Sequence, residues 1–452
     1  MLNQRLSAYL RHVLFTLRGG FLIRPAIIAL ALAGLGAGLS AVEELYPASS
    51  SWIPTFLFPS NADPQVAQII LSSIATSMMT VVAIVFAILL MTLTLASMQF
   101  SPRIITTFVS DLVTQQTLGI YLGTFLYCIA ALPAARTIPM PFSPVLTVLG
   151  AMILSVACVG WLLFFIHHIS MAISVNYIVD RIARETEAMI DGMMPHPRRA
   201  DAWQEGPPGD PDPREMPVPG VVSGYVRTID ATQLRGIAKA HRLSVRVLRR
   251  VGHFVPADVP LLTISKPKAL TPGMSVDLRR AFRLGPTRTL EQDIEFGVLQ
   301  LVDIALKAIS PAVNDPSTLL NCIDQLSSVL IHFAAREAPR TNFYDPPGVL
   351  QVSIPYVGFD RLLESAFEQI RLYARADVAV SLRILRALSD IALTLPDNAD
   401  RRLLAVHGRQ LLRGCSQVLS EDLLAELKSR LASLEKITTS DSSAPLLVLP
   451  DS

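Results

Sequence analysis

Serine and threonine residues recur among small residues on one side of a long apolar stretch, Ile69–Met98. At heptad spacing, Leu90 is the only large residue of this stripe. In lipid, small residues let helices approach closely, and hydroxyl groups bond across helices or line water. The stripe therefore predicts either a packing seam within one subunit or a pore-lining helix of an oligomer, whose hydroxyls replace water around an ion. It consists of Ser73, Thr76, Thr80, Ala83, Ala87, Thr94 and Ser97.

Charged and imidazole side chains mark the ends of two apolar stretches. Arg103 follows the second stretch, and we expect it to be an interfacial anchor or one member of an arginine ring that attracts anions or lipid headgroups. His167 and His168 end the fourth stretch. Adjacent helical residues point about 100° apart, so the pair cannot ligate one metal together. Interfacial histidines at a helix C-terminus are the expectation, with metal ligation and pH sensing as alternatives.

A polar motif in the C-terminal half also bears residues that could do chemistry. A Mg²⁺ or Ca²⁺ site would use its carboxylates, but their spacing matches no metal-binding loop, whereas helix ion pairs and a capped turn explain the same residues. The candidate ligand-binding or structural residues are Arg288, Asp303, Asn314, Asp315 and Asp324. Neighbouring arginines either bind an anionic ligand or lipid headgroups, or form a solvated basic face: Arg279, Arg280, Arg283 and Arg288.

The composition indicates a chain that is partly outside water. Of its 452 residues 51% are hydrophobic and only 17% charged, against about 25% charged in soluble domains. The net charge of +2 excludes a strong field for nucleic acid. The four cysteines match no CxxC or zinc spacing, and no P-loop, GxSxG, HExxH or kinase motif occurs. We therefore predict no metal site, no cofactor and no enzymatic activity.

Four apolar stretches are long enough to span a bilayer, which takes about 20 residues. They run over about Phe21–Val42, Ile69–Met98, Leu118–Ala135 and Val145–Ile169. The second is longer than a bilayer requires, and projection into a cytoplasmic vestibule would favour the pore. Arginines precede the first stretch and follow the fourth, whereas the loop Glu43–Gln68 has no Lys or Arg, so both termini should be cytoplasmic. No carboxylate lies inside these stretches, which argues against a proton relay.

The rest of the chain predicts an α+β region. Strands are expected over Val222–Ile229 and Pro260–Ile264 around a helix at Ala231–His241, in a small barrel-like domain. A capping box at Thr289 and an N-cap at Asp315 predict two helices, which are followed by a strand and four further helices. We expect a four-helix transmembrane domain (1–170), an amphipathic helix and Pro-rich linker (171–220), a β-rich domain (221–270), a helical cytoplasmic domain (271–437) and a disordered tail (438–452).

Five segments carry motifs of a known family: MTLTLASMQFSPRIITTF (91–108), LGTFLYCIAAL (122–132), FFIHHIS (164–170), SGYVRTID (223–230) and TRTLEQDIEFGVLQLVDIALKAISPAVNDPST (287–318). In this order they resemble a widespread bacterial group of predicted membrane proteins, domain of unknown function 2254. The resemblance covers most of the chain and implies an inner-membrane protein of several spans with a cytoplasmic C-terminal region. It implies no activity, ligand or catalytic residue.

Three functions remain open from the sequence. The first is an oligomeric channel or pore with a cytoplasmic regulatory region, in the bacterial inner membrane. The second is a membrane-anchored sensor or scaffold without transport activity, and the third is a substrate carrier. The expected partners are the lipid bilayer, further copies of the chain and an ion or small ligand of unknown identity, with no nucleic acid.

Overall fold

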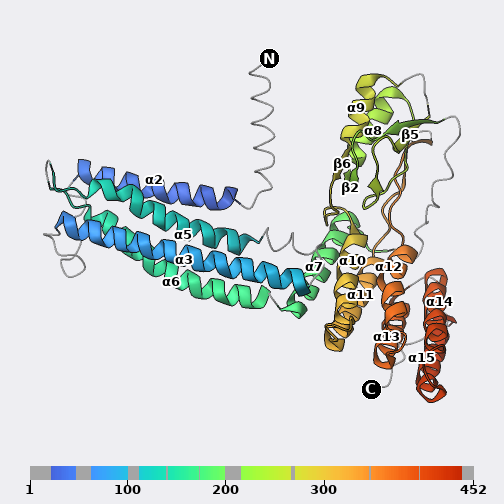
Figure 1. The fold of residues 1–452 in the computed structure, drawn as a ribbon. Coiled ribbons are helices and arrows are strands. Elements are labelled where there is room, and N and C mark those ends of the chain that lie inside the picture. The colour runs from blue at the N-terminus through green and yellow to red at the C-terminus, as the bar shows by residue number, and fades with distance from the viewer. Residues whose placement is uncertain are drawn as a thin grey trace. The chain divides into compact units, whose positions relative to one another are not determined.

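The computed structural model of the protein describes residues 22–46, 63–99, 111–138, 141–172, 174–198, 215–265, 270–345, 348–395 and 398–439 (Figure 1). The chain divides into two compact units, residues 1–174 and 175–452. We call them the membrane unit and the second unit and describe each by itself.

The membrane unit contains four long apolar helices within its described residues. All four have the length and composition of membrane spans, as predicted. The short 3-10 helix η2 (Leu132–Ala134) follows the third. The four helices are α2 (Ile23–Leu45), α3 (Pro64–Gln99), α5 (Leu112–Ala131) and α6 (Val145–Ala172).

Helix α5 packs closely on α2 through glycines. A Cβ atom at Gly123 would lie 2.5 Å from Leu32 Cδ1 and 3.2 Å from Ala29 Cα. At Gly119, one turn earlier, it would lie 3.0 Å from the Cα of Pro25. The two residues form a GxxxG motif, which allows such close approach in lipid. Because the contact positions rise together along both helices, α2 and α5 run in the same direction.

Helix α5 also packs on α6, and polar side chains join these two helices. The Tyr127 hydroxyl donates to the Thr147 carbonyl at 3.0 Å, and the Tyr121 hydroxyl donates to the Cys158 carbonyl at 3.1 Å. The Trp161 indole N–H donates to Thr117 Oγ1 at 2.9 Å. Hydrogen bonds of this kind stabilise helix pairs where no water competes.

The start of α6 is held by a buried carboxylate. Glu43 is 2% exposed and accepts from the backbone amides of Leu146 and Thr147, at 2.8 and 3.2 Å. These amides belong to the first turn of α6, where no intrahelical acceptor exists and the helix dipole favours an anion. The sequence analysis ended this span at Val42 and expected no carboxylate inside the spans. This expectation is wrong for Glu43, because α2 extends to Leu45.

The second unit begins with the amphipathic helix α7 (Val175–Met193), which packs on α10 (Ile294–Ala308) and α11 (Pro316–Ala334). Four helices follow in its C-terminal part, as predicted. They are α12 (Phe359–Tyr373), α13 (Val378–Thr394), α14 (Asn398–Cys415) and α15 (Glu421–Thr439). Beyond Thr439 the predicted disordered tail lies outside the described residues.

The strands of the second unit form two open sheets, and the prediction of a barrel-like domain is wrong. One sheet has the order β1-β5-β3-β8-β7 and the other β4-β2-β6, and within the described residues neither closes on itself. The strands are too short and too often interrupted by the helices α8 (Ala231–His241) and α9 (Pro272–Arg280) to form a continuous ladder. They are β1 (Met216–Pro219), β2 (Gly224–Ile229), β3 (Val245–Val247), β4 (Phe254–Val255), β5 (Pro260–Ile264), β6 (Phe282–Gly285), β7 (Asn342–Asp345) and β8 (Val349–Ser353).

The N-caps of α10 and α11 test the two capping predictions. Asp315 caps α11, because its carboxylate accepts from the Thr318 amide at 3.1 Å, as predicted. The capping box at Thr289 is wrong. Helix α10 begins at Ile294 and is capped by Asp293, which accepts from the Phe296 amide at 3.1 Å.

Candidate functional site

The predicted stripe of α3 lies on the surface of the single chain. All six members whose side chains are described are exposed: Ser73, Thr76, Thr80, Ala83, Ala87 and Thr94. The side chain of Ser97 lies outside the described residues. The residues that α3 buries against its neighbours, such as Leu71, Met78 and Val85, lie about half a helical turn away from the stripe. Among the described helices of the membrane unit, the stripe is therefore not a packing seam.

Three hydroxyl groups of the stripe bond within α3 itself. Thr76 donates to the Ser72 carbonyl at 2.9 Å, Thr80 to the Thr76 carbonyl at 3.2 Å, and Thr94 to the Leu90 carbonyl at 2.8 Å. Each hydroxyl thereby uses its only proton and keeps acceptor lone pairs. The surface is consequently one of small side chains and oxygen acceptors.

The residues predicted at the span ends have different outcomes. Arg103 lies outside the described residues. His167 is exposed, whereas His168 Nε2 lies 3.1 Å from the carboxylate of Asp111, which caps α5. The described residues hold no group of three or more potential metal ligands. His168 therefore ties the end of α6 to the start of α5.

The polar motif of the second unit is not brought together as one carboxylate cluster. Asp324 forms a two-pronged pair with Arg383 of α13, at 2.5 and 2.6 Å, while Asp315 serves as the α11 cap. Asn314 is exposed in the turn before α11, with a positive φ of 47°. Asp303 is half-buried in the interior of α10. Of the five candidates, Arg288 alone leads to a larger network.

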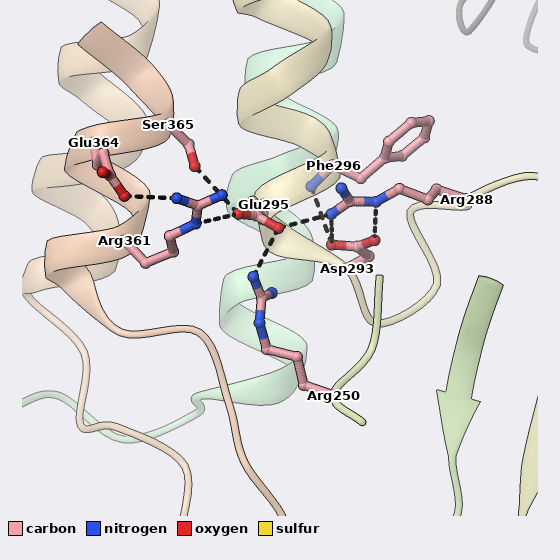
Figure 2. A network of polar contacts seen from close by, with 8 residues as sticks. All are labelled: Arg250, Arg288, Asp293, Glu295, Phe296, Arg361, Glu364 and Ser365. Carbon is pink, nitrogen blue, oxygen red and sulfur yellow. Dashed lines mark hydrogen bonds and ion pairs between the residues drawn. The ribbon is translucent and has the colours of Figure 1, made fainter. Parts of the chain in front are cut away.

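That network centres on Glu295, which is 4% exposed at the start of α10 (Figure 2). One carboxylate oxygen accepts from Arg250 and Arg288, both at 3.0 Å. The other accepts from Arg361 of α12 at 3.0 Å and from the Ser365 hydroxyl at 3.1 Å. A buried carboxylate requires such partners, and here they fasten the sheet region, α10 and α12 to one group.

Arg288 also holds the cap of α10. Its guanidinium donates two hydrogen bonds of 2.7 Å to Asp293, and its Cζ lies 5.6 Å from the ring centre of Phe296. Gly252 passes directly over this pair with a φ of +88°, and a Cβ there would lie 2.6 Å from both Arg288 Nη2 and Asp293 Oδ2. Only glycine fits that turn.

The charges around Glu295 govern two protonation states. Burial alone would raise the pKa of Glu295, but Arg250 and Arg288 outweigh it and lower the pKa from 4.5 to about 2. Burial and the neighbouring Arg250 lower the pKa of His253, so this imidazole stays neutral near pH 7. The network is therefore charged at every physiological pH.

Sequence reasoning missed Asp293, Glu295, Arg250 and Arg361. One signal was available, because Glu295 stands in a run whose neighbours Ile294, Phe296 and Val298 are all apolar. A carboxylate in such a run must find a cation on folding. The identity of that cation was not readable, because Arg250 and Arg361 lie 45 and 66 residues away.

Beside the network, the second unit contains a cavity of about 660 Å³. It is lined from the C-terminal end of α7, the start of α8, the turn after β3, the junction of α9 and β6, and the segment after β8. Arg250, Arg280 and Arg283 are among its lining residues, as is the buried Ile354. Its size is within the usual range of small-molecule sites, about 300–1,000 Å³.

The comparisons with known proteins identify a family of predicted membrane proteins. The sequence profile of the family described as "Predicted membrane protein (DUF2254)" matches residues 18–390. The chain belongs to this family. It is 32% identical over 410 residues to an uncharacterized protein of Mycobacterium tuberculosis (strain H37Rv) and equally to one of Mycobacterium bovis, covering 89% of this chain and 76% of each relative. No solved structure matches.

Proposed function

We propose that this protein is a pore-forming membrane protein in which copies of α3 surround a water-filled pathway, with the second unit regulating it. The proposal rests on one observation, the exposure of the stripe Ser73, Thr76, Thr80, Ala83, Ala87 and Thr94 on a helix long enough to span the bilayer. Symmetric association of several chains would bring these stripes together around one axis.

The chemistry of the stripe supports water or a cation as its occupant. Because the hydroxyls of Thr76, Thr80 and Thr94 donate to their own helix, the lone pairs that remain can accept from water or coordinate a cation. The small side chains leave room along the axis. We further propose the bacterial inner membrane with both termini cytoplasmic, which the arginine-free loop Glu43–Gln68 supports. The proposal assigns no enzymatic activity.

Cysteine accessibility tests this proposal. Thr80→Cys and Thr94→Cys should react in membranes with a charged, membrane-impermeant thiol reagent and should cross-link between copies under mild oxidation. Background reaction should be low because Cys128, Cys158, Cys322 and Cys415 are all buried. Met79→Cys, at the adjacent position and about 100° around the helix, is the control and should react slowly. Equal protection of all three positions from the reagent, without cross-links, would contradict a water-filled pathway.

The second candidate is a membrane-anchored sensor without transport. The cavity of the second unit favours this candidate, because a sensor requires a ligand-binding site and does not require a pore. In that case α3 would face lipid only, which its internally satisfied hydroxyls tolerate.

A further inference from the structure

We infer that the cavity of the second unit is a binding site for a phosphate-bearing small molecule with an apolar body. Nothing in the family assigns a ligand to this region, and the inference stands apart from the pore proposed above. It rests on the cationic residues, the unused hydrogen-bond donors and the apolar surface that line one cavity of about 660 Å³.

The cationic side of the argument comes from Arg280 and Arg283. They line the cavity from the end of α9 and from β6, and both side chains are about 70% exposed. Among the described residues each has one loose acidic neighbour, Asp277 at 3.4 Å for Arg280 and Glu291 at 3.6 Å for Arg283. Exposed pairs of this length contribute little, so both guanidiniums are available to an anion. Arg250, by contrast, is committed to Glu295.

Two carboxylates also line the cavity, and both are already used. Asp293 is neutralised by the two hydrogen bonds from Arg288. Asp230 caps α8, because its carboxylate accepts from the Gln233 amide at 2.9 Å. The first two amides of α8, those of Ala231 and Thr232, have no acceptor within the helix and lie at the cavity. An anion at this place meets an arginine pair and a helix N-terminus.

Further donors are unused. The amide oxygen of Gln292 accepts from the Ile229 amide at 3.0 Å, which leaves its NH₂ group as a donor. The hydroxyl of Tyr356 makes no hydrogen bond within the part of the chain that the structure describes, and burial raises its pKa, so it remains a neutral donor. Phosphate oxygens accept from such groups and from guanidinium forks together.

Other lining residues of the cavity are apolar, and inorganic phosphate alone would leave them without a partner. Met193, Val251 and Val357 line the same cavity and are half-buried, so each keeps apolar surface that a ligand can contact. Together with Tyr356 they offer a surface for an aromatic base or an acyl chain. The ligand chemistry is therefore a phosphate joined to an apolar group, as in a nucleotide or in a lipid headgroup with its acyl chains.

Calorimetric titration of the full-length protein in a neutral detergent tests this inference. Three probes are compared: adenosine 5′-monophosphate, dihexanoyl phosphatidic acid below its micelle concentration, and inorganic phosphate. We expect one of the two organic phosphates to bind saturably and at least tenfold more tightly than inorganic phosphate. Which of them binds distinguishes a soluble ligand from a lipid. Absence of saturable binding by both organic phosphates, or equal affinity for inorganic phosphate, overturns the inference.

Variants locate the binding. Arg280→Gln and Arg283→Gln should each weaken the probe at least tenfold, and Tyr356→Phe should weaken it about fivefold, the equivalent of one hydrogen bond. The matched control is Arg386→Gln, which removes an exposed arginine with a loose acidic neighbour at 4.0 Å on α13, outside the cavity. It should leave affinity unchanged. Equal weakening by Arg386→Gln would show general charge attraction and would overturn the site.

Discussion

Two surfaces of the membrane unit carry small residues, and only one of them packs on another of the described helices. The glycine face of α5 is in van der Waals contact with α2, so that a single Cβ at Gly123 would clash with Leu32. The stripe of α3 also consists of small side chains, yet it is exposed among the residues that the structure describes. The comparison shows that a row of small residues allows close packing but does not identify the surface that packs on it. For the α3 stripe, no such surface lies among the described residues.

The largest loss of stability should come from a larger side chain on the glycine face of α5. Gly123→Leu places a side chain where Leu32 and Ala29 already lie, and we expect a loss of about 3 kcal/mol of stability, because Leu32 and the Ala29 backbone must move to make room. Thermal unfolding of the protein in detergent measures it. Gly160→Leu on α6 is the control, because a Cβ there meets open space. Similar losses for both variants would remove the distinction between used and unused surfaces.

The buried ion-pair network of Glu295 in the second unit should also contribute strongly to stability. Glu295→Gln removes the charge that holds three arginines and should cost about 3 kcal/mol at pH 7. Since the folded-state pKa is about 2 and the ordinary value 4.5, the advantage of the wild type is complete above about pH 4.5 and is lost as the pH falls toward 2. Hydrogen exchange of the α10 amides as a function of pH measures it. A difference that does not change with pH would show that the carboxylate is not ionised in the folded protein.

The hydroxyl bonds between α5 and α6 should have a smaller effect. Tyr127→Phe removes the bond to the Thr147 carbonyl and leaves the ring in place, so we expect a loss of about 1 kcal/mol. Tyr46→Phe, whose side chain is exposed, should be neutral. Thermal unfolding of both variants gives the comparison, and an unchanged midpoint for Tyr127→Phe would mean that α5 and α6 are held by packing alone.

The smallest effect should be found on the unused surface. Thr76→Ala removes a hydroxyl that bonds only to its own helix, and the stability of the single chain should change by less than about 0.5 kcal/mol. The same unfolding experiment measures it. A loss as large as that of Tyr127→Phe would return the stripe to the role of an intrachain seam.

Local signals in the sequence predicted much of the fold. The four spans, the Asp315 cap and the helices α12 to α15 follow from apolar length, capping chemistry and 3.6-residue periodicity. The sequence also contains the GxxxG motif of Gly119 and Gly123, but a motif does not name its partner helix. In the sequence, Thr289 and Asp293 are equally good candidates for the N-cap of α10. Asp293 is the cap in the structure, where Arg288 and the turn at Gly252 hold its side chain.

The rest depends on contacts between distant segments. Strand β3 pairs in parallel with β8, about a hundred residues later. The pattern of nearby strands that predicted a barrel-like domain contains no sign of this pairing. The Glu295 network likewise needs Arg250 and Arg361 from two other segments. Local periodicity contains no information about such pairings, and only the assembled sheets and helices supply it.

The central claim is that the α3 stripe lines a pathway, and ion flux into liposomes tests it most directly. Thr80→Trp should abolish flux while the assembled protein keeps its size in detergent, whereas Met79→Trp, equally bulky and adjacent, should leave flux unchanged. Absence of flux in the unmodified protein at every voltage, tension and pH applied, or loss of assembly in Thr80→Trp, would contradict the account and favour a membrane anchor.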